Sequence, residues 1–406
     1  MSKKIDIVLV GIGGYGAGYV RETLVLQAAG QIRISAVIDP FARENRLSWP
    51  PLQATGVPCF DTLEAGLAAG IRGDLAVISS PIGFHAEQVC AAVAAGMDVL
   101  CEKPLCGHAS EIPAMLAARD QAGRTVSVGY QWSFSKAISQ AKEDILAGRF
   151  GAPLDFRSLT SWPRGRKYYE RNNWAGRIRD DQGRWVCDSP ANNATAHFLH
   201  SMLYLLGPQR DRSATPTAVT GECYRANPIE NFDAVCCRID TREGVPVLFF
   251  SAHCVAERQG PIVQYRFEEA VMELNAEGTL CARCHNGEVI EYGQPGKDNW
   301  RKLRKCIEWT REDRRETWCG IEAAMRQTQC VSSLQQVPIN TFPSEIVRHQ
   351  PWEEDDELTR VSGLEQAMTA GFDAGQLFSE MDVPWSVAAR RVDLAETALD
   401  PLKRSS

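Results

Sequence analysis

The chain has 406 residues, of which 44% are hydrophobic, and its formal net charge is −7 at pH 7. This length and apolar content are enough for two domains, each with its own core. The negative charge argues against a nucleic-acid partner or an anionic membrane surface, because both need concentrated positive charge. No apolar stretch approaches the length of a membrane span, and the first predicted strand begins too early for an export signal to precede it. We therefore expect a cytoplasmic protein without membrane contact.

The first predicted strand leads directly into a glycine-rich turn. Residues 6–16 read Asp-Ile-Val-Leu-Val-Gly-Ile-Gly-Gly-Tyr-Gly, and residues 17–29 have the character of a helix. In this order the three spaced glycines give a tight turn, a close approach of the backbone to a diphosphate, and a close contact between helix and sheet. The segment predicts a dinucleotide cradle formed by Gly11, Ile12, Gly13, Gly14, Tyr15 and Gly16.

A second apolar run, residues 34–38, ends in Asp39, which follows Gly16 by 23 residues. A carboxylate at this distance can accept hydrogen bonds from the ribose hydroxyls of the dinucleotide. It would repel a 2′-phosphate, so we expect NAD as the cofactor in preference to NADP. The alternative is that Asp39 only caps the turn after its strand.

Further strands and helices alternate up to residue 131. Strands are predicted over 75–79, 97–101 and 125–129, with helices over 87–95 and 112–122. This alternation predicts a doubly wound parallel sheet of the Rossmann type, an α/β domain over residues 1–131.

After about residue 150, strands follow one another with few helices between them. These strands are predicted over 154–161, 218–225, 234–240, 245–253, 262–268 and 271–275. Helices are predicted over 315–334 and 363–381, and the acidic run 351–357 is expected to be a solvated loop. The pattern predicts a second, α+β domain over 132–406 with an open, largely antiparallel sheet.

The 14 cysteines are expected to be thiols in the cytoplasm. One group, Cys281-Ala-Arg-Cys284-His285, matches a haem-attachment pattern. The alternating apolar residues around it and the following Asn286-Gly287 predict a hairpin instead. In a strand the two cysteines point to opposite faces, so we expect no metal or haem site here.

Two segments near the end of the first domain carry a resemblance to a known family. Residues 77–85 read Val-Ile-Ser-Ser-Pro-Ile-Gly-Phe-His, and residues 94–105 read Ala-Ala-Gly-Met-Asp-Val-Leu-Cys-Glu-Lys-Pro-Leu. With the glycine turn and Asp39 they resemble the Gfo/Idh/MocA family of sugar and cyclitol oxidoreductases. The resemblance implies hydride transfer between NAD and a sugar-like carbon, and a second domain that supplies the substrate pocket and the contacts of a homodimer or homotetramer. The further cofactor contacts that it implies are Ser79, Ser80, Pro81, His85, Glu102, Lys103 and Gln131.

The resemblance also implies the catalytic residues Lys103, His197 and Asn193. Lys103 follows a parallel strand at its carboxyl end, where ligands bind in such sheets, and can move the hydroxyl proton. It also implies a cis bond before Pro104. Residues 192–207 resemble the family's Asp-x-Gly-x-His helix, with Asn193 where an aspartate is usual and His200 where a second one is common. On one helix, Asn193, His197 and His200 would share a face, and the neutral Asn193 would leave His197 a weaker base.

Residues 162–177 interleave aromatic side chains with arginine and asparagine. This mixture suits a carbohydrate, whose ring faces stack on tryptophan and whose hydroxyls accept planar donors. An oligomer-contact loop is the alternative. Ser133 stands where the family often has an arginine, which argues against a substrate carboxylate or phosphate at that spot. The predicted substrate-binding residues are Trp132, Trp162, Tyr168, Trp174, Arg177, Asn193 and His200.

Together these features predict an oxidoreductase that transfers a hydride between NAD and a hydroxyl carbon of a sugar, glycoside or cyclitol. One alternative is an NAD-dependent glycosidase of the same fold, which oxidises its substrate transiently to allow elimination. The other is a non-enzymatic regulator that senses dinucleotides, because the usual aspartate is absent at Asn193. Each activity would leave the organic chemistry to the cofactor, while the protein orients the substrate and moves a proton.

Overall fold

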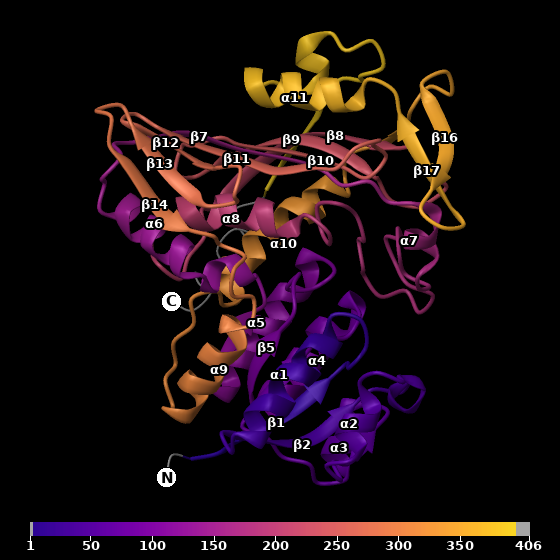
Figure 1. Cartoon of the computed structure of the whole chain (residues 1–406), viewed down its shortest axis with the longest axis vertical. Helices are drawn as coiled ribbons and strands as arrows, with labels where there is room; N and C mark the ends of the chain where they lie inside the picture. The colour runs from indigo at the N-terminus through magenta and orange to yellow at the C-terminus, as the bar shows by residue number, and fades with distance from the viewer. Residues whose placement is uncertain (1–2, 395–406) are drawn as a thin grey trace. The chain divides into compact units, whose positions relative to one another are not determined.

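The computed structural model describes residues 3–394, and the chain forms two compact units (Figure 1). Unit 1 contains the chain up to Phe134 and the later segment Asp298–Ala324, and unit 2 contains Ser135–Lys297 and the chain from Met325 onward. The expected division into 1–131 and 132–406 assigns the later segment to the second domain. In the structure its helix α9 (Arg301–Arg311) packs against strands of unit 1 and buries Leu303, Cys306, Ile307 and Trp309.

Unit 1 is built on a six-stranded sheet in which every pair of neighbours is parallel. The strands lie in the order β3-β2-β1-β4-β5-β6. They are β1 (Ile5–Val10), β2 (Ile32–Ile38), β3 (Cys59–Phe60), β4 (Leu75–Ile78), β5 (Asp98–Cys101) and β6 (Val126–Val128). All residues of β4 and β5 are buried, as strands covered on both faces require. The order reverses direction beside β1, which creates the crevice where ligands bind in such sheets.

Five helices connect these strands: α1 (Gly16–Ala28), α2 (Trp49–Gln53), α3 (Leu63–Ala68), α4 (His85–Ala94) and α5 (Ile112–Ala122). Helix α9 joins unit 1 from the later segment. Short 3-10 turns complete the connections at η1 (Ala42–Glu44), η2 (Ile82–Phe84), η3 (Ala109–Glu111) and η4 (Gln131–Phe134). The predicted alternation of strand and helix is confirmed.

Unit 2 contains a ten-stranded sheet in the order β14-β13-β12-β11-β7-β10-β9-β8-β15, with β18 also paired to β8. The strands are β7 (Pro153–Ser161), β8 (Pro216–Arg225), β9 (Ala234–Thr241), β10 (Val247–Ala252), β11 (Gln259–Phe267), β12 (Ala270–Leu274), β13 (Leu280–Cys284), β14 (Val289–Gly293), β15 (Ile339–Thr341) and β18 (Arg390–Asp393). Only the pairs β7–β10 and β8–β15 are parallel among the described residues. The predicted fold class, a parallel doubly wound sheet followed by a largely antiparallel one, is confirmed.

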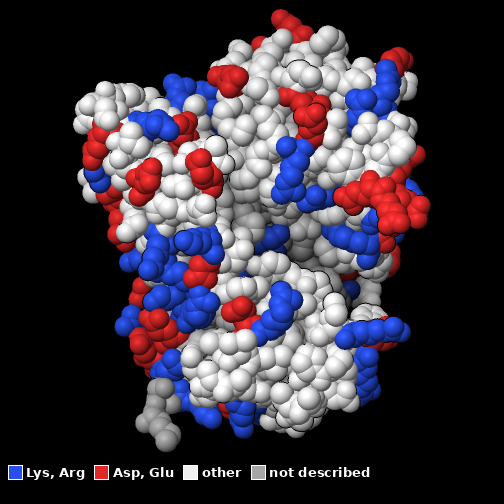
Figure 2. Space-filling model, viewed as in Figure 1, with Lys and Arg blue, Asp and Glu red and all other residues white. Residues whose placement is uncertain are grey.

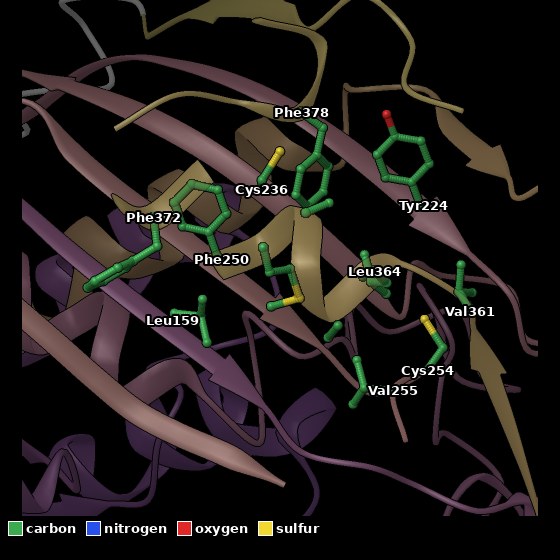
Figure 3. Close-up of a cluster of buried hydrophobic side chains, with 14 of the residues drawn as sticks. Leu159, Tyr224, Cys236, Phe250, Cys254, Val255, Val361, Leu364, Phe372 and Phe378 are labelled. Atoms are coloured by element: carbon green, nitrogen blue, oxygen red, sulfur yellow. The ribbon is translucent and has the colours of Figure 1, made fainter. Parts of the chain in front are cut away.

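Helices cover both faces of the unit 2 sheet (Figure 1). On one face lie α6 (Lys136–Leu146), α8 (Ala196–Leu206) and α10 (Ile321–Leu334), and on the other lies α11 (Leu364–Ala374). Figure 3 shows the core beneath α11, in which Phe372 and the 3-10 turn η5 (Phe378–Met381) meet Leu159 and Phe250 of the sheet. The guanidinium of Arg157 on β7 donates to the carbonyls of Phe372 and Asp373, at 2.7 and 2.8 Å, and so caps the end of α11.

Several boundaries differ from the sequence predictions. Helix α10 begins only at Ile321, and the predicted helix over 363–381 ends at Ala374 because Gly375 adopts a left-handed φ of 70°. The acidic run 351–357, expected as a loop, includes the turn and strand ends of a hairpin, β16 (Val347–Trp352) and β17 (Asp356–Val361), and Figure 2 shows an acidic group at this turn. Helices α6 and α9 were not predicted.

The hairpin predicted around Asn286-Gly287 is confirmed by the antiparallel pairing of β13 with β14. Gly287 has a φ of 92°, a backbone conformation that favours glycine. All 14 cysteines lie among the described residues and are free thiols. Between residues 3 and 394, no helix combines the length and the apolar character that crossing a membrane would take.

Candidate functional site

The glycine-rich turn after β1 has a crowded side and an open side. A Cβ on Gly11 would lie 2.8 Å from the backbone of Ser79, and one on Gly16 would lie 2.5 Å from the carbonyl oxygen of Gly11. These two glycines are therefore required by the turn itself. On the open side, a Cβ on Gly13 would meet nothing closer than 3.7 Å, and one on Gly14 would meet nothing within 4 Å. Helix α1 starts beside this space, so the cradle fits the diphosphate of a dinucleotide.

Asp39 links the end of β2 to this cradle. Its Oδ2 accepts a hydrogen bond from the backbone N–H of Ile12 at 2.9 Å, and its Oδ1 accepts one from Phe41 at 2.8 Å. The second contact is the turn cap that the sequence left open as an alternative. A carboxylate has about four acceptor positions, so the half-buried Asp39 retains capacity for ribose hydroxyls. The cap and the cofactor role are compatible.

Two further turns at the same edge of the sheet are joined by His85. Its Nδ1 lies 2.8 Å from the carbonyl oxygen of Pro104, and its Nε2 lies 3.0 Å from that of Ser80. The Ser79 hydroxyl donates to the carbonyl of Gly11 at 2.8 Å, and the peptide bond between Lys103 and Pro104 is cis. Burial lowers the pKa of His85. The His85 ring thus lies between the turn before Pro81 and the turn that carries Lys103, and when neutral it donates to one of these two carbonyls.

A buried network of charged and phenolic groups surrounds Glu102. Lys302 of α9 forms an ion pair with its Oε1, and the same oxygen accepts a hydrogen bond from the Tyr19 hydroxyl at 2.6 Å. Lys302 also donates to the carbonyl of Gly129 at 3.2 Å, and its side chain is 0% exposed. Burial alone would lower the pKa of Lys302, but the charge of Glu102 and the contact with Tyr15 raise it overall. The lysine therefore remains charged inside unit 1.

The network extends to the predicted nicotinamide side of the cradle. Lys302 Nζ lies 3.4 Å from the Tyr15 hydroxyl, which donates to Oε1 of Gln131 at 3.2 Å. The backbone N–H of the half-buried Lys103 donates to Oε2 of Glu102 at 3.2 Å. Trp132 is only 8% exposed and packs into unit 1. The structure thus brings Tyr15, Glu102, Lys103 and Gln131 together.

Trp300, just before α9, packs on the helix that follows the cradle. A Cβ on Gly18 of α1 would lie 2.2 Å from its ring, which also contacts the rings of Tyr15 and Tyr19 at centroid distances of 5.7 and 5.1 Å. The sequence analysis missed both Trp300 and Lys302. The sequence does carry one indication that Lys302 is buried, because its spacing places it on the apolar face of α9 with Cys306 and Trp309.

In unit 2, the predicted grouping of Asn193, His197 and His200 on one helix is wrong. Helix α8 begins at Ala196, so Asn193 lies in the turn before it. His197 occupies the first turn and is half-buried. His200 is 1% exposed and stacks on Tyr204, with ring centroids 5.7 Å apart. Both histidines do lie on the predicted helix, but Asn193 could share their face only if it were helical as well.

The environment of His200 is that of a core residue. Burial, and next the charge of Lys142, lower the pKa of His200 to about 3. Lys142 Nζ lies 3.9 Å from the centroid of the Tyr204 ring on which His200 stacks. His200 is therefore neutral at pH 7, but it belongs to the interior, so we do not propose it as a substrate contact.

Asn193 does have a carboxylate beside it, which the sequence analysis did not include. Oδ1 of Asp188 accepts a hydrogen bond from Nδ2 of Asn193 at 2.8 Å, and Oδ2 accepts one from the backbone N–H of Gly176 at 2.7 Å. Arg171 lies 3.6 Å from the same carboxylate, which is 2% exposed. The usual aspartate is thus absent at Asn193 but a buried aspartate lies one hydrogen bond away. The spacing of residues in the sequence does not predict this contact, because Asp188 lies in a loop.

The aromatic and basic residues of 162–177 gather partly as predicted. The guanidinium carbon of Arg171 lies 3.8 Å from the ring centroid of Tyr168 and 5.2 Å from that of Trp174. Trp162 contacts Phe198 of α8 edge to face at 5.6 Å. Arg177 instead forms an exposed ion pair with Asp181. The structure therefore places Trp162, Tyr168 and Trp174 in contact with arginines, and Arg171 rather than Arg177 joins them.

Comparisons with known proteins fit this geometry. Residues 5–130 match the GFO_IDH_MocA model, described as an oxidoreductase family with an NAD-binding Rossmann fold. The chain is 29% identical over 197 residues to inositol 2-dehydrogenase 2 of Saccharopolyspora erythraea, covering 48% of this chain and 57% of that protein. It is 33% identical over 150 residues to the rhizopine catabolism protein MocA of Rhizobium meliloti, covering 35% and 43%. The chain thus spans about half the length of these curated relatives.

Solved structures resemble about four fifths of the chain in fold. The WlbA dehydrogenase from Bordetella pertussis, in complex with NADH and UDP-GlcNAcA, has a TM-score of 0.65 at 20% identity and is matched over 82% of this chain and 95% of its own. An oxidoreductase domain protein from Kribbella flavida has a TM-score of 0.66 at 15% identity, over 83% and 97%. These likenesses show the fold, and the match over residues 5–130 confirms the NAD-binding Rossmann fold expected from the sequence.

The cofactor preference can be tested at the end of β2. We expect Asp39→Ser combined with Phe41→Arg to weaken NAD binding about tenfold and to strengthen NADP binding, because a repelling carboxylate is replaced and a guanidinium is added. Titration calorimetry with both cofactors measures this, and Phe41→Arg alone is the control. Tighter binding of NADP than of NAD by the unaltered protein would show that Asp39 does not set the preference.

The buried ion pair predicts unequal effects for two lysines of α9. Lys302→Met should lower the free energy of unfolding by about 3–5 kcal/mol, because it leaves Glu102 buried without its partner. Lys305→Met removes a more exposed pair with Glu308 and should change it by at most about 1 kcal/mol. Urea unfolding measures both. Similar losses in the two variants would contradict the importance of the buried pair.

The buried imidazole of His200 predicts a stability loss in acid. Its pKa is about 3 in the folded protein against 6.5 for the free side chain, so the unfolded chain binds the extra proton first as the pH falls below 6.5. Between pH 7 and pH 5 the free energy of unfolding should fall by about 2 kcal/mol more in the unaltered protein than in His200→Phe. Urea unfolding at both pH values tests this. The exposed His285→Asn should behave like the unaltered protein, and equal pH dependence in all three would refute the assignment.

Proposed function

Because residues 5–130 match the model of the Gfo/Idh/MocA oxidoreductase family, we propose that the chain is a member of this family and an NAD-dependent dehydrogenase of a sugar, glycoside or cyclitol. The observation that carries this proposal is the position of Lys103. It lies beyond the carboxyl end of β5, where a parallel sheet binds ligands, and next to Glu102 of the buried network. The inositol 2-dehydrogenase relatives support a polyhydroxylated ring as substrate.

Unit 1 would hold the cofactor and move the proton. NAD, when bound, supplies the hydride acceptor. The glycine turn and the start of α1 would hold the diphosphate, Asp39 the ribose, and Gln131 the nicotinamide side. The amine of Lys103 would accept the proton of the reacting hydroxyl while the hydride leaves. His85 and Glu102 fix the turn on which Lys103 lies, which limits the positions its amine can take.

Unit 2 would supply substrate contacts. Asn193, held by Asp188, can donate to or accept from a hydroxyl, and His197 lies in the first turn of α8 directly after it. Trp162, Tyr168 and Trp174 offer rings for the apolar faces of a sugar. A homodimer or homotetramer and a cytoplasmic location stay predictions.

The proposal is tested by NAD reduction over a panel of sugars, p-nitrophenyl glycosides and inositols, followed by Lys103→Ala on the best substrate. We expect turnover to fall at least about a hundredfold while NAD affinity stays nearly intact, because a proton-transfer group is lost and no diphosphate contact changes. Lys305→Ala is the control.

Other outcomes would point to the alternatives. Release of p-nitrophenol without net NADH would indicate the glycosidase. Tight NAD binding with no turnover on any compound would favour a regulator. A Lys103→Ala variant with the unaltered rate would remove Lys103 from the reaction.

A further inference from the structure

Three arginines of unit 2 place their guanidinium groups on aromatic rings. The guanidinium carbons of Arg258 and Arg164 lie 4.4 and 5.9 Å from the centroid of the same ring, that of Trp162. Arg164 also lies 4.9 Å from the centroid of Tyr168, and Arg171 lies 3.8 Å from it. Arg258 lies in the loop between β10 and β11, far from the other two arginines in sequence. The fold therefore concentrates positive charge around these two rings.

This charge is only partly compensated. Asp188 lies 3.6 Å from Arg171, and its oxygens already accept hydrogen bonds from Asn193 and Gly176. Within residues 3–394, no carboxylate lies within 4 Å of a side-chain nitrogen of Arg164 or Arg258. The buried Nε of Arg164 has no hydrogen-bond partner in this part of the chain either. Nη1 of Arg164 donates to the carbonyl of Pro163 at 3.2 Å, and the guanidinium also hydrogen-bonds the Tyr168 hydroxyl. A guanidinium has five N–H donors, so these contacts occupy only some of them.

His253, which also packs on one of these rings, adds no charge at pH 7. His253 packs edge to face on Tyr168, with ring centroids 5.7 Å apart, and its Nδ1 lies 2.9 Å from the carbonyl oxygen of Trp162. Burial, and next the charge of Arg164, lower the pKa of His253 to about 3, so it is neutral at pH 7. The cluster thus combines apolar ring faces with two guanidinium groups, of Arg164 and Arg258, that have no carboxylate partner within the described residues.

We propose that Arg164 and Arg258 bind an oxyanion carried by the substrate, so that the preferred substrate is a sugar acid or a sugar phosphate rather than a neutral sugar or cyclitol. This inference rests on the proposed dehydrogenase function. The planar guanidinium fork matches a carboxylate or a phosphate with paired N–H donors, and the rings beside it take the apolar face of the sugar. These arginines belong to unit 2, whereas Ser133, where the sequence argued against an anion, belongs to unit 1.

The experiment compares matched compounds. For glucose, galactose and mannose, kcat/KM for NAD reduction is measured with the neutral sugar, its uronate and its 6-phosphate. Binding of each compound is measured separately by titration calorimetry, with no turnover needed. The double variant Arg164→Gln/Arg258→Gln is compared with Arg166→Gln, in which an exposed arginine of the neighbouring α7 (Arg166–Glu170) loses its pair with Glu170.

We expect at least one oxyanionic compound to exceed its neutral partner in kcat/KM by at least about tenfold, mainly through KM. The double variant should reduce this ratio about 10- to 100-fold, whereas Arg166→Gln should retain it. A larger effect on uronates identifies a carboxylate as the ligand, and a larger effect on 6-phosphates identifies a phosphate. Arg164→Lys/Arg258→Lys should recover part of the ratio, which a folding defect would not allow.

The outcomes separate this inference from the function on which it rests. Turnover of neutral sugars with no preference for their anionic partners, or a preference that survives in the double variant, would overturn the anion site and leave the dehydrogenase standing. Oxyanion binding that the double variant loses, without NAD reduction by any compound, would support the anion site and count against the dehydrogenase. Neither binding nor turnover would overturn both.

Discussion

The ion pair between Glu102 and Lys302 joins segments two hundred residues apart and places them in one interior. Glu102 precedes the lysine that we propose moves the proton, while Lys302 belongs to the helix that returns to unit 1 after the long sheet of unit 2. Separating two buried charges of opposite sign is expensive, so the pair keeps α9 against the parallel sheet. Tyr19 and the carbonyl of Gly129 satisfy further hydrogen-bonding positions, as a buried pair requires.

The same network fixes the surroundings of Lys103. Lys103 lies beside Glu102, which pairs with Lys302 and accepts a hydrogen bond from Tyr19. Tyr15 contacts the same lysine, Lys302, and the His85 ring lies between the turn that carries Lys103 and the turn after β4. A proton-transfer group is effective only when its position is restricted, and here several buried contacts restrict the backbone of the turn that carries Lys103.

In unit 2 the chemistry depends on loops that a large sheet supports. Asp188 compensates for the neutral residue at 193 by a direct hydrogen bond, so the local charge is not what the family resemblance alone suggested. The arginines around Trp162 and Tyr168 come from separate loops at the ends of β7 and β10. Helix α11 covers the opposite face of the sheet, and Arg157 ties the end of that helix to β7. Packing on both faces therefore holds the sheet in place independently of its loops.

The sequence pattern was sufficient to predict those features that depend on a few neighbouring residues. The glycine turn, Asp39 at the end of β2, the parallel order of the first sheet and the hairpin at Asn286-Gly287 follow from spacing and backbone preference, which act over short distances. The start of α8 did not follow, because the residues before Ala196 have helical spacing but lie in a turn fixed by Asp188 and its loop. Lys302, Asp188 and Arg258 reach their partners only through contacts between distant segments. Such contacts depend on which faces the folded chain buries together, and the tertiary structure alone decided them.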